Sequence, residues 1–137
     1  MKTGYLLIAH GALASELLRT LEFIAGPQPS FRAVAVDHAV EVDMARQIVE
    51  QAINEMMGDG DGGVVVLTDL FGGAPSNIAM SMMDDKRMEI VAGVNLPLLI
   101  HATLMEDNLS LKEKAQRLRD YGRNNIFVAS EVLSGRR

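Results

Sequence analysis

Four short apolar runs, separated by segments with helical spacing, constrain the fold of this chain more than any other feature. The runs occupy residues 4–10, 31–37, 63–69 and 88–93. Between them, apolar residues recur at steps of three and four, which places them on one face of an amphipathic helix. Apolar strands that alternate with such helices are typical of a parallel sheet covered on both faces. The sequence therefore predicts a three-layer α/β fold with a mainly parallel, four-stranded sheet.

The helical segments carry start and stop signals. The apolar stripe of the first, before a Gly-Pro pair, consists of Leu13, Leu17, Leu18, Leu21 and Ile24. A similar stripe runs through residues 42–56. Helices are predicted to open at Pro75 and Pro97, because proline is favoured in a first helical turn. The sequence SLKE at residues 110–113 is a capping box that starts a further helix, which ends near Gly122.

The segment NNIFVASEVL, residues 124–133, is predicted to be a last strand. It is more mixed in polarity than the other four runs, which fits a strand at the edge of a sheet. The pattern leaves two positions open. The strand either lies at the edge of its own sheet or pairs with a second copy of the chain.

Composition limits the class of protein. The chain has 137 residues, the size of one domain, and residues 1–137 are assigned to a single domain. No apolar run approaches the roughly 20 residues that span a bilayer, and the start lacks a signal-peptide pattern. Cysteine is absent, so disulfides are excluded. A soluble, cytoplasmic protein is expected. The net charge of −5 and the 4% aromatic content argue against a nucleic-acid partner.

Two polar residues end predicted strands: His10 ends the first and Asp69 ends the third. Ligands of parallel α/β sheets bind beyond the carboxyl ends of the strands. If these two strands are neighbours, as right-handed connections permit, the carboxylate can hydrogen-bond one imidazole nitrogen and leave the other as a nucleophile. On its own, a histidine at a strand end also fits a structural role, with its ring hydrogen-bonded to a loop carbonyl.

The stretch TDLFGGAPSN, residues 68–77, adds a second component. Its two glycines allow a tight turn whose backbone N–H groups point into one concavity before a helix, and such a concavity can hold an oxyanion. A plain strand-to-helix turn has the same pattern. Together with His10 and Asp69, however, this turn supplies what is needed to carry a phosphoryl group on histidine. That chemistry needs no metal and no cofactor.

Three motifs now support a family resemblance. LLIAHG around His10, LTDLFGGAPSNIA at 67–79 and VAGVNLPLL at 91–99 resemble, in order and spacing, the IIA domain of the mannose family of the bacterial sugar phosphotransferase system (PTS). The resemblance covers most of residues 4–105. It implies that His10 receives a phosphoryl group from the phosphocarrier protein HPr and donates it to a IIB partner. By the same resemblance, Asp69 is the aspartate that hydrogen-bonds this histidine.

The resemblance also implies a homodimer, and at one position this chain differs from many members of the family. The family's parallel four-stranded sheet is joined by a fifth, antiparallel strand exchanged between the subunits of a homodimer, and membrane contact is indirect, through a permease. Many members have serine where this chain has Ala74. The backbone N–H groups of Gly72, Gly73 and Ala74, together with Ser76, are then expected to hold the phosphate.

Three alternatives accompany this interpretation. The chain stops after one domain without a IIB-like segment, which also fits a free-standing regulator that binds another protein in one phosphorylation state. His10, His38 and Asp69 could instead form the metal centre of a hydrolase. A response-regulator receiver would be phosphorylated on Asp69, but this chain has His10 and Gly11 where receivers need an acidic pair for magnesium.

Overall fold

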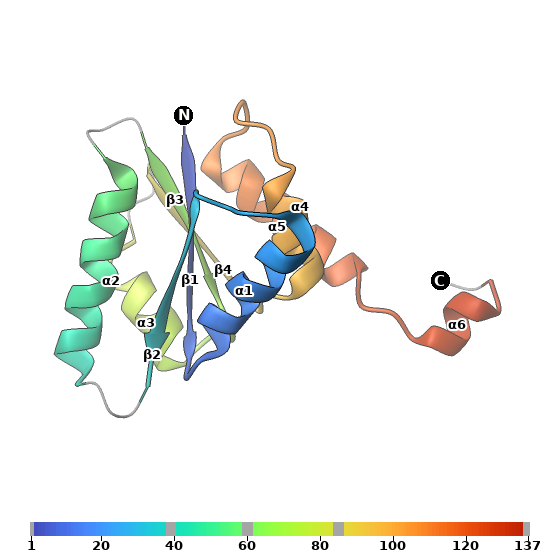
Figure 1. Ribbon diagram of the computed structural model, residues 1–137, viewed down its shortest axis with the longest axis horizontal. Helices are drawn as coiled ribbons and strands as arrows, with labels where there is room; N and C mark the ends of the chain where they lie inside the picture. The colour runs from blue at the N-terminus through green and yellow to red at the C-terminus, as the bar shows by residue number, and fades with distance from the viewer. Residues whose placement is uncertain (1, 38–40, 59–61, 84–86, 136–137) are drawn as a thin grey trace.

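A four-stranded parallel sheet forms the centre of the computed structural model, which describes residues 2–37, 41–58, 62–83 and 87–135 (Figure 1). The order in the sheet is β2-β1-β3-β4. The strands are β1 (Thr3–His10), β2 (Phe31–Val36), β3 (Gly63–Thr68) and β4 (Met88–Ala92). The predicted parallel sheet is confirmed, and each strand begins and ends within one residue of its predicted bounds.

Burial along the strands explains the pattern of the sequence. The central strand β3 is buried at every residue, because helices cover both of its faces. The edge strands β2 and β4 contain both buried and more exposed positions. An unbroken apolar run therefore marks a strand in the middle of this sheet.

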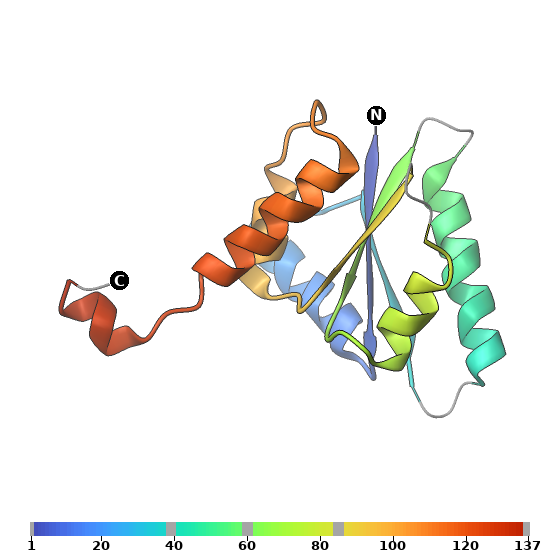
Figure 2. The same cartoon turned by 180° about the vertical axis from the view of Figure 1, so that it is seen from behind.

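Five helices cover the two faces of the sheet (Figures 1 and 2). One face is covered by α1 (Leu13–Ala25), α4 (Leu96–Thr103) and α5 (Leu111–Asn124). The other is covered by α2 (Val42–Met57) and α3 (Ala74–Met80). The predicted apolar stripes are wider than the buried faces, since Leu13, Ile24, Val42 and Ile48 are exposed. In the described part of the chain, none of the helices has the length and apolar character needed to cross a bilayer.

Side-chain hydrogen bonds cap the starts of α4 and α5. The predicted capping box is confirmed: the Ser110 hydroxyl accepts the N–H of Glu113, and the Glu113 carboxylate accepts the N–H of Ser110. At the start of α4, the Asn95 side chain accepts the N–H of Leu98 and donates to the carbonyl of Gly122. Asn95 therefore joins the start of α4 to the end of α5.

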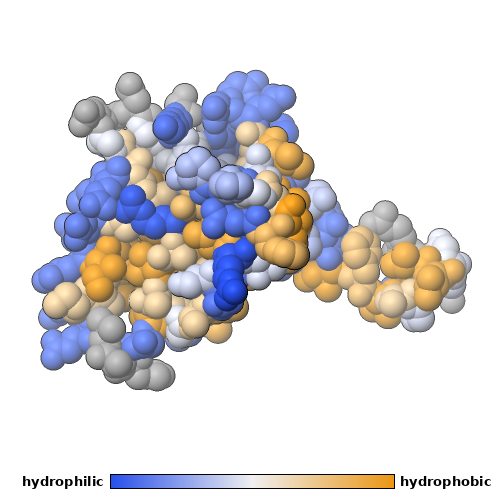
Figure 3. All heavy atoms as spheres, viewed as in Figure 1, coloured by the Kyte–Doolittle hydropathy of each residue, from blue (hydrophilic) through white to orange (hydrophobic). Residues whose placement is uncertain are grey.

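The C-terminal arm, residues 125–135, differs from the sequence prediction. Residues 129–133 form a short helix, α6 (Ala129–Leu133), so the predicted strand is wrong over that stretch. Residues 126–128 have no regular secondary structure in the single chain. The arm runs away from the body and its surface is largely apolar (Figures 1 and 3). Its exchange into a second copy stays a prediction.

Candidate functional site

His10 and Asp69 meet at the carboxyl ends of β1 and β3, at the bottom of Figure 1. The two strands are hydrogen-bonded neighbours, with Ile8 opposite Thr68, as the sequence analysis required. The Nδ1 atom of His10 lies 2.8 Å from Oδ2 of Asp69. The same oxygen accepts the backbone N–H of His10 at 3.0 Å. The predicted contact between these two residues is thus present.

This contact decides the tautomer of the neutral imidazole ring. An ionised carboxylate can only accept hydrogen bonds, so Nδ1 of His10 carries a hydrogen, and in the neutral ring Nε2 has the free lone pair. Nε2 has no hydrogen-bond partner among the described residues. The side chain of His10 is 44% exposed, whereas that of Asp69 is 10% exposed. The ring can therefore present a nucleophilic nitrogen to another molecule.

Asp69 is held in its ionised form. Burial opposes ionisation and raises its pKa, but hydrogen bonds from the backbone and ring of His10 and from the backbone N–H of Leu70 outweigh burial. The net effect lowers the pKa of Asp69 below its ordinary value. A carboxylate in this state fixes the ring and stabilises positive charge that develops on it.

The glycine turn lies against the other side of the ring. Gly72 has a φ of +92°, a conformation that favours glycine. A Cβ atom added to Gly73 would lie 2.9 Å from Cε1 and 3.4 Å from Nε2 of His10. Only a residue without a side chain lets the backbone approach the imidazole this closely. The turn and the ring are therefore in direct contact.

The four residues predicted to hold phosphate differ in their surroundings. Ser76 is fully buried, and its hydroxyl accepts the N–H of Gly72 at 2.8 Å. The backbone N–H groups of Gly73 and Ala74 have no hydrogen-bond partner among the described residues. Both belong to the start of α3, where the N–H groups of the first turn lack partners within the helix. Gly72 and Ser76 are thus hydrogen-bonded to each other, whereas the N–H groups of Gly73 and Ala74 are available to bind a ligand.

Of the two other histidines, one lies outside the described residues and the other packs on an aromatic ring. His38 falls outside the described residues, and so does the proposed metal centre that includes it. Among the residues that are described, no three His, Asp or Glu side chains converge to hold a metal. His101 stacks on Tyr121 with ring centroids 4.2 Å apart and an interplanar angle of 8°. His101 is therefore a packed residue.

Apolar residues next to the site were not identified from the sequence. Leu13, Leu70 and Phe71 follow β1 and β3 closely in the chain and are 44%, 50% and 74% exposed. The sequence TDLF, residues 68–71, could have indicated them. In it, two large apolar residues directly follow an aspartate that ends a strand, and this position lies outside the buried core. Large apolar side chains exposed beside a reactive nitrogen suit contact with a protein partner.

Comparison with known proteins assigns the family. The family EIIA-man, described as "PTS system fructose IIA component", matches residues 4–119. The chain belongs to this family. As a mannose-family PTS IIA component, it is 30% identical to the PTS system fructose-specific EIIA component of Bacillus subtilis (strain 168). That match covers 90% of this chain and 84% of the relative.

Further relatives agree with this assignment. The IIA component is 33% identical over 101 residues to the PTS system mannose-specific EIIAB component of Escherichia coli (strain K12), a match that covers 72% of this chain and 30% of that protein. The crystal structure of a PTS IIA protein associated with the fucose utilization operon of Streptococcus pneumoniae has a TM-score of 0.82 at 27% identity, with 97% of each chain covered. The mannose/sorbose-specific IIA subunit of Enterococcus faecalis has a TM-score of 0.79 at 28% identity, covering 93% of this chain and 95% of that one.

Proposed function

We propose that this IIA component accepts a phosphoryl group from HPr on Nε2 of His10 and passes it to a IIB partner during sugar uptake. One observation carries the proposal. Nδ1 of His10 is hydrogen-bonded to the Asp69 carboxylate at 2.8 Å, so in the neutral ring Nε2 is the nitrogen without a hydrogen, on a side chain that is 44% exposed. A neutral imidazole nitrogen in this position can attack phosphorus.

The transfer step balances with these two side chains. The lone pair of Nε2 forms a bond to phosphorus while the bond between phosphorus and the histidine nitrogen of the donor breaks, and the bonding electrons leave with the donor. The His10 ring gains positive charge as this bond forms. Asp69 stabilises that charge through Nδ1–H without taking the proton. The reverse sequence at Nε2 transfers the group to the next protein.

The phosphoryl oxygens need donors beside Nε2. We assign this role to the backbone N–H groups of Gly73, which adjoins His10, and of Ala74, the next residue; neither group has a partner among the described residues. Gly72 and Ser76 shape the same turn through their mutual hydrogen bond. The positive end of the α3 dipole adds to the attraction for an anion. This set supports phosphate binding although Ala74 offers no hydroxyl.

The proposal includes a homodimer. Strand β4 pairs only with β3 among the described residues, so its other edge is open. A groove of about 490 Å³ runs along β4 and α5 and is lined by Ile126 of the arm, among other residues. The arm exposes apolar side chains: Ile126, Phe127, Val128, Val132 and Leu133. An open edge and an apolar arm in one chain support exchange of the arm between two copies.

Phosphorylation in vitro tests the proposal. Phosphoenolpyruvate, the general enzyme of the system and HPr should together add one phosphoryl group to the intact protein, observed by mass spectrometry as an acid-labile, base-stable modification. The variant His10→Ala should take none. His101→Ala is the matched control, because that ring stacks on Tyr121 and should leave labelling intact. Labelling that persists in His10→Ala overturns the assignment.

A further inference from the structure

The hydroxyl of Ser76 lies inside the turn that contacts His10. Ser76 has 0% of its surface exposed. Its Oγ accepts the backbone N–H of Gly72 at 2.8 Å and donates to the carbonyl of Gly73 at 3.2 Å. One side chain is therefore hydrogen-bonded to both glycines of the turn.

Asn77 completes this set of contacts. Its side-chain amide donates to the carbonyl of Gly72 at 3.3 Å, and its backbone N–H donates to the carbonyl of Gly73 at 2.9 Å. The N–H and carbonyl of Gly72 and the carbonyl of Gly73 are thus all hydrogen-bonded to Ser76 or Asn77. The N–H of Gly73 is the one polar backbone group of these two glycines without a partner among the described residues.

The turn fixed in this way sets the position of the imidazole. Nδ1 of His10 is hydrogen-bonded to Asp69, and Gly73 approaches the ring at its Cε1 atom. Glycine at position 72 has many accessible backbone conformations, so a turn of two glycines keeps one conformation only if other groups hold it. Ser76 and Asn77 are those groups.

We infer that Ser76 is a positioning residue whose hydroxyl holds the Gly72–Gly73 turn against His10, so that Nε2 and the free N–H of Gly73 face the incoming phosphoryl group together. The inference rests on the proposed function for the reaction it serves. It differs from the expectation that Ser76 contacts the phosphate. The single hydrogen of its hydroxyl already donates to Gly73, and the side chain is buried.

The state before phosphorylation distinguishes positioning from phosphate contact. In unphosphorylated Ser76→Ala, we expect NMR shifts at the backbone amides of Gly72 and Gly73 and at the Cε1–H group of His10. Ser81→Ala is the matched control, since it removes a hydroxyl that donates to a carbonyl within α3, away from the turn. In that variant the three signals should stay where they are.

Kinetics provides the second measurement. Transfer from phosphorylated HPr to Ser76→Ala should show a maximal rate that is lower by about tenfold, within the range that follows from small misplacement of a reacting group. The HPr concentration at half-maximal rate should not change, because a buried hydroxyl cannot touch a partner. Asn77→Ala, which removes the other side-chain bond to the turn at an exposed position, should lower the maximal rate in the same way.

The outcomes of these measurements distinguish positioning by Ser76 from phosphate contact and from a merely structural role. Shifts at His10 together with a lower maximal rate and an unchanged half-saturation support positioning. Unshifted His10 signals in the unphosphorylated variant overturn it, and a shorter lifetime of the phosphorylated form alone would then assign Ser76 to phosphate contact. A lower melting temperature with an unchanged rate overturns it in favour of a merely structural role. If the wild type takes no phosphate, the proposed function fails, whereas the NMR result still decides the position of the turn.

Discussion

Oδ2 of Asp69 accepts two hydrogen bonds from His10, one from the backbone N–H at 3.0 Å and one from Nδ1 at 2.8 Å. A single oxygen therefore fixes both the end of β1 and the orientation of its last side chain. The other oxygen, Oδ1, accepts the N–H of Leu70 at 3.0 Å. Because both oxygens are engaged, the carboxylate cannot rotate without losing at least one of these bonds.

This geometry predicts the effect of neutralising Asp69. The variant Asp69→Asn should fold, because the amide has nearly the same shape, but transfer to His10 should slow roughly 100-fold or more as the ring loses its charged partner. Rapid-quench measurement of transfer from phosphorylated HPr gives the rate. Asp120→Asn, at an exposed aspartate beside Arg119, is the control. An unchanged rate in Asp69→Asn would contradict the role of the carboxylate.

The same contacts predict that the free energy of unfolding depends on pH in the acid range. The pKa of Asp69 is lowered from 3.8 in the fold, since its hydrogen bonds outweigh the effect of burial. The folded state thus binds this proton less readily than the unfolded chain, so the stabilisation is present above pH 3.8 and is lost as the pH falls through the lower, folded pKa. Urea unfolding from pH 7 down to pH 3 should show the difference between wild type and Asp69→Asn shrinking at the acid end. A difference that grows there would refute the sign.

Gly73 offers a direct test of contact between turn and ring. Gly73→Ala places a methyl group 2.9 Å from Cε1 of His10 and 3.0 Å from Cδ1 of Leu70, so the ring or the turn must move. Transfer should slow by about tenfold or more, in line with misplacement of a reacting group. Gly72→Ala is the matched variant: its Cβ meets nothing within 4 Å, but the φ of +92° is strained for alanine.

The pair of variants separates two effects. Gly72→Ala should lower the free energy of unfolding by about 1–2 kcal/mol through backbone strain. Gly73→Ala should mainly lower the transfer rate, because its φ of −85° is ordinary for alanine. Chemical unfolding and single-turnover transfer measure the two quantities. Equal transfer rates for Gly73→Ala and the wild type would show that the ring does not depend on this contact.

Parts of the fold and of the site could be predicted from the sequence where they depend on local pattern or on topology, but not where they depend on tertiary contacts. The β1–β3 adjacency and the meeting of His10 with Asp69 follow from strand-end positions and from right-handed connections, both of which are local or topological. The hydrogen bond between Ser76 and Gly72 was not predictable, because the hydroxyl contacts this N–H only once the turn has adopted its tertiary geometry. The arm was predicted as a strand from its apolar residues, but the hydrogen bonds of a strand come from a partner that a single sequence does not specify.

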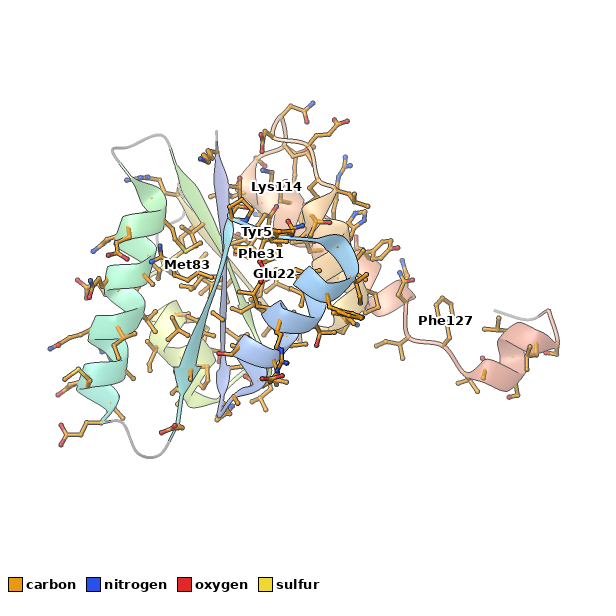
Figure 4. The ribbon with its side chains drawn as sticks, viewed as in Figure 1. Tyr5, Glu22, Phe31, Met83, Lys114 and Phe127 are labelled. Carbon is orange, nitrogen blue, oxygen red and sulfur yellow. The ribbon has the colours of Figure 1, made fainter. Side chains whose placement is uncertain are left out.

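A buried polar pair at the opposite end of the sheet is predicted to affect stability and not transfer. Lys114, labelled in Figure 4, is 1% exposed. Its Nζ donates to Oγ1 of Thr3 at 2.6 Å. Thr3→Val keeps the shape of the side chain and removes this acceptor, which should lower the free energy of unfolding by about 1–3 kcal/mol. Thr103→Val is the control, since that hydroxyl donates to the carbonyl of Ile100 within its own helix. Phosphorylation of His10 should be unaffected, and a loss of labelling in Thr3→Val would contradict this separation.

The C-terminal arm predicts the oligomeric state. Ile126, Val128 and Leu133 are 75%, 58% and 87% exposed in the single chain, and β4 has an open edge. Apolar exposure of this kind is unfavourable in water, and an unpaired strand edge invites an added strand. The wild-type protein should therefore be a dimer by size-exclusion chromatography with light scattering. Deletion of residues 126–137 should give a monomer that keeps its circular dichroism spectrum.

A shorter deletion sharpens this test. Removal of residues 134–137 keeps every apolar residue named above and should leave the dimer intact. Ile126→Asp and Val128→Asp place charges on the arm where it would lie against β4, and should weaken the dimer because a charge is costly to bury without a partner. The monomeric forms should still take phosphate on His10, since the ring, Asp69 and the glycine turn all belong to one chain. A monomeric wild type at high protein concentration, or a dimer that survives the longer deletion, would rule out exchange of the arm.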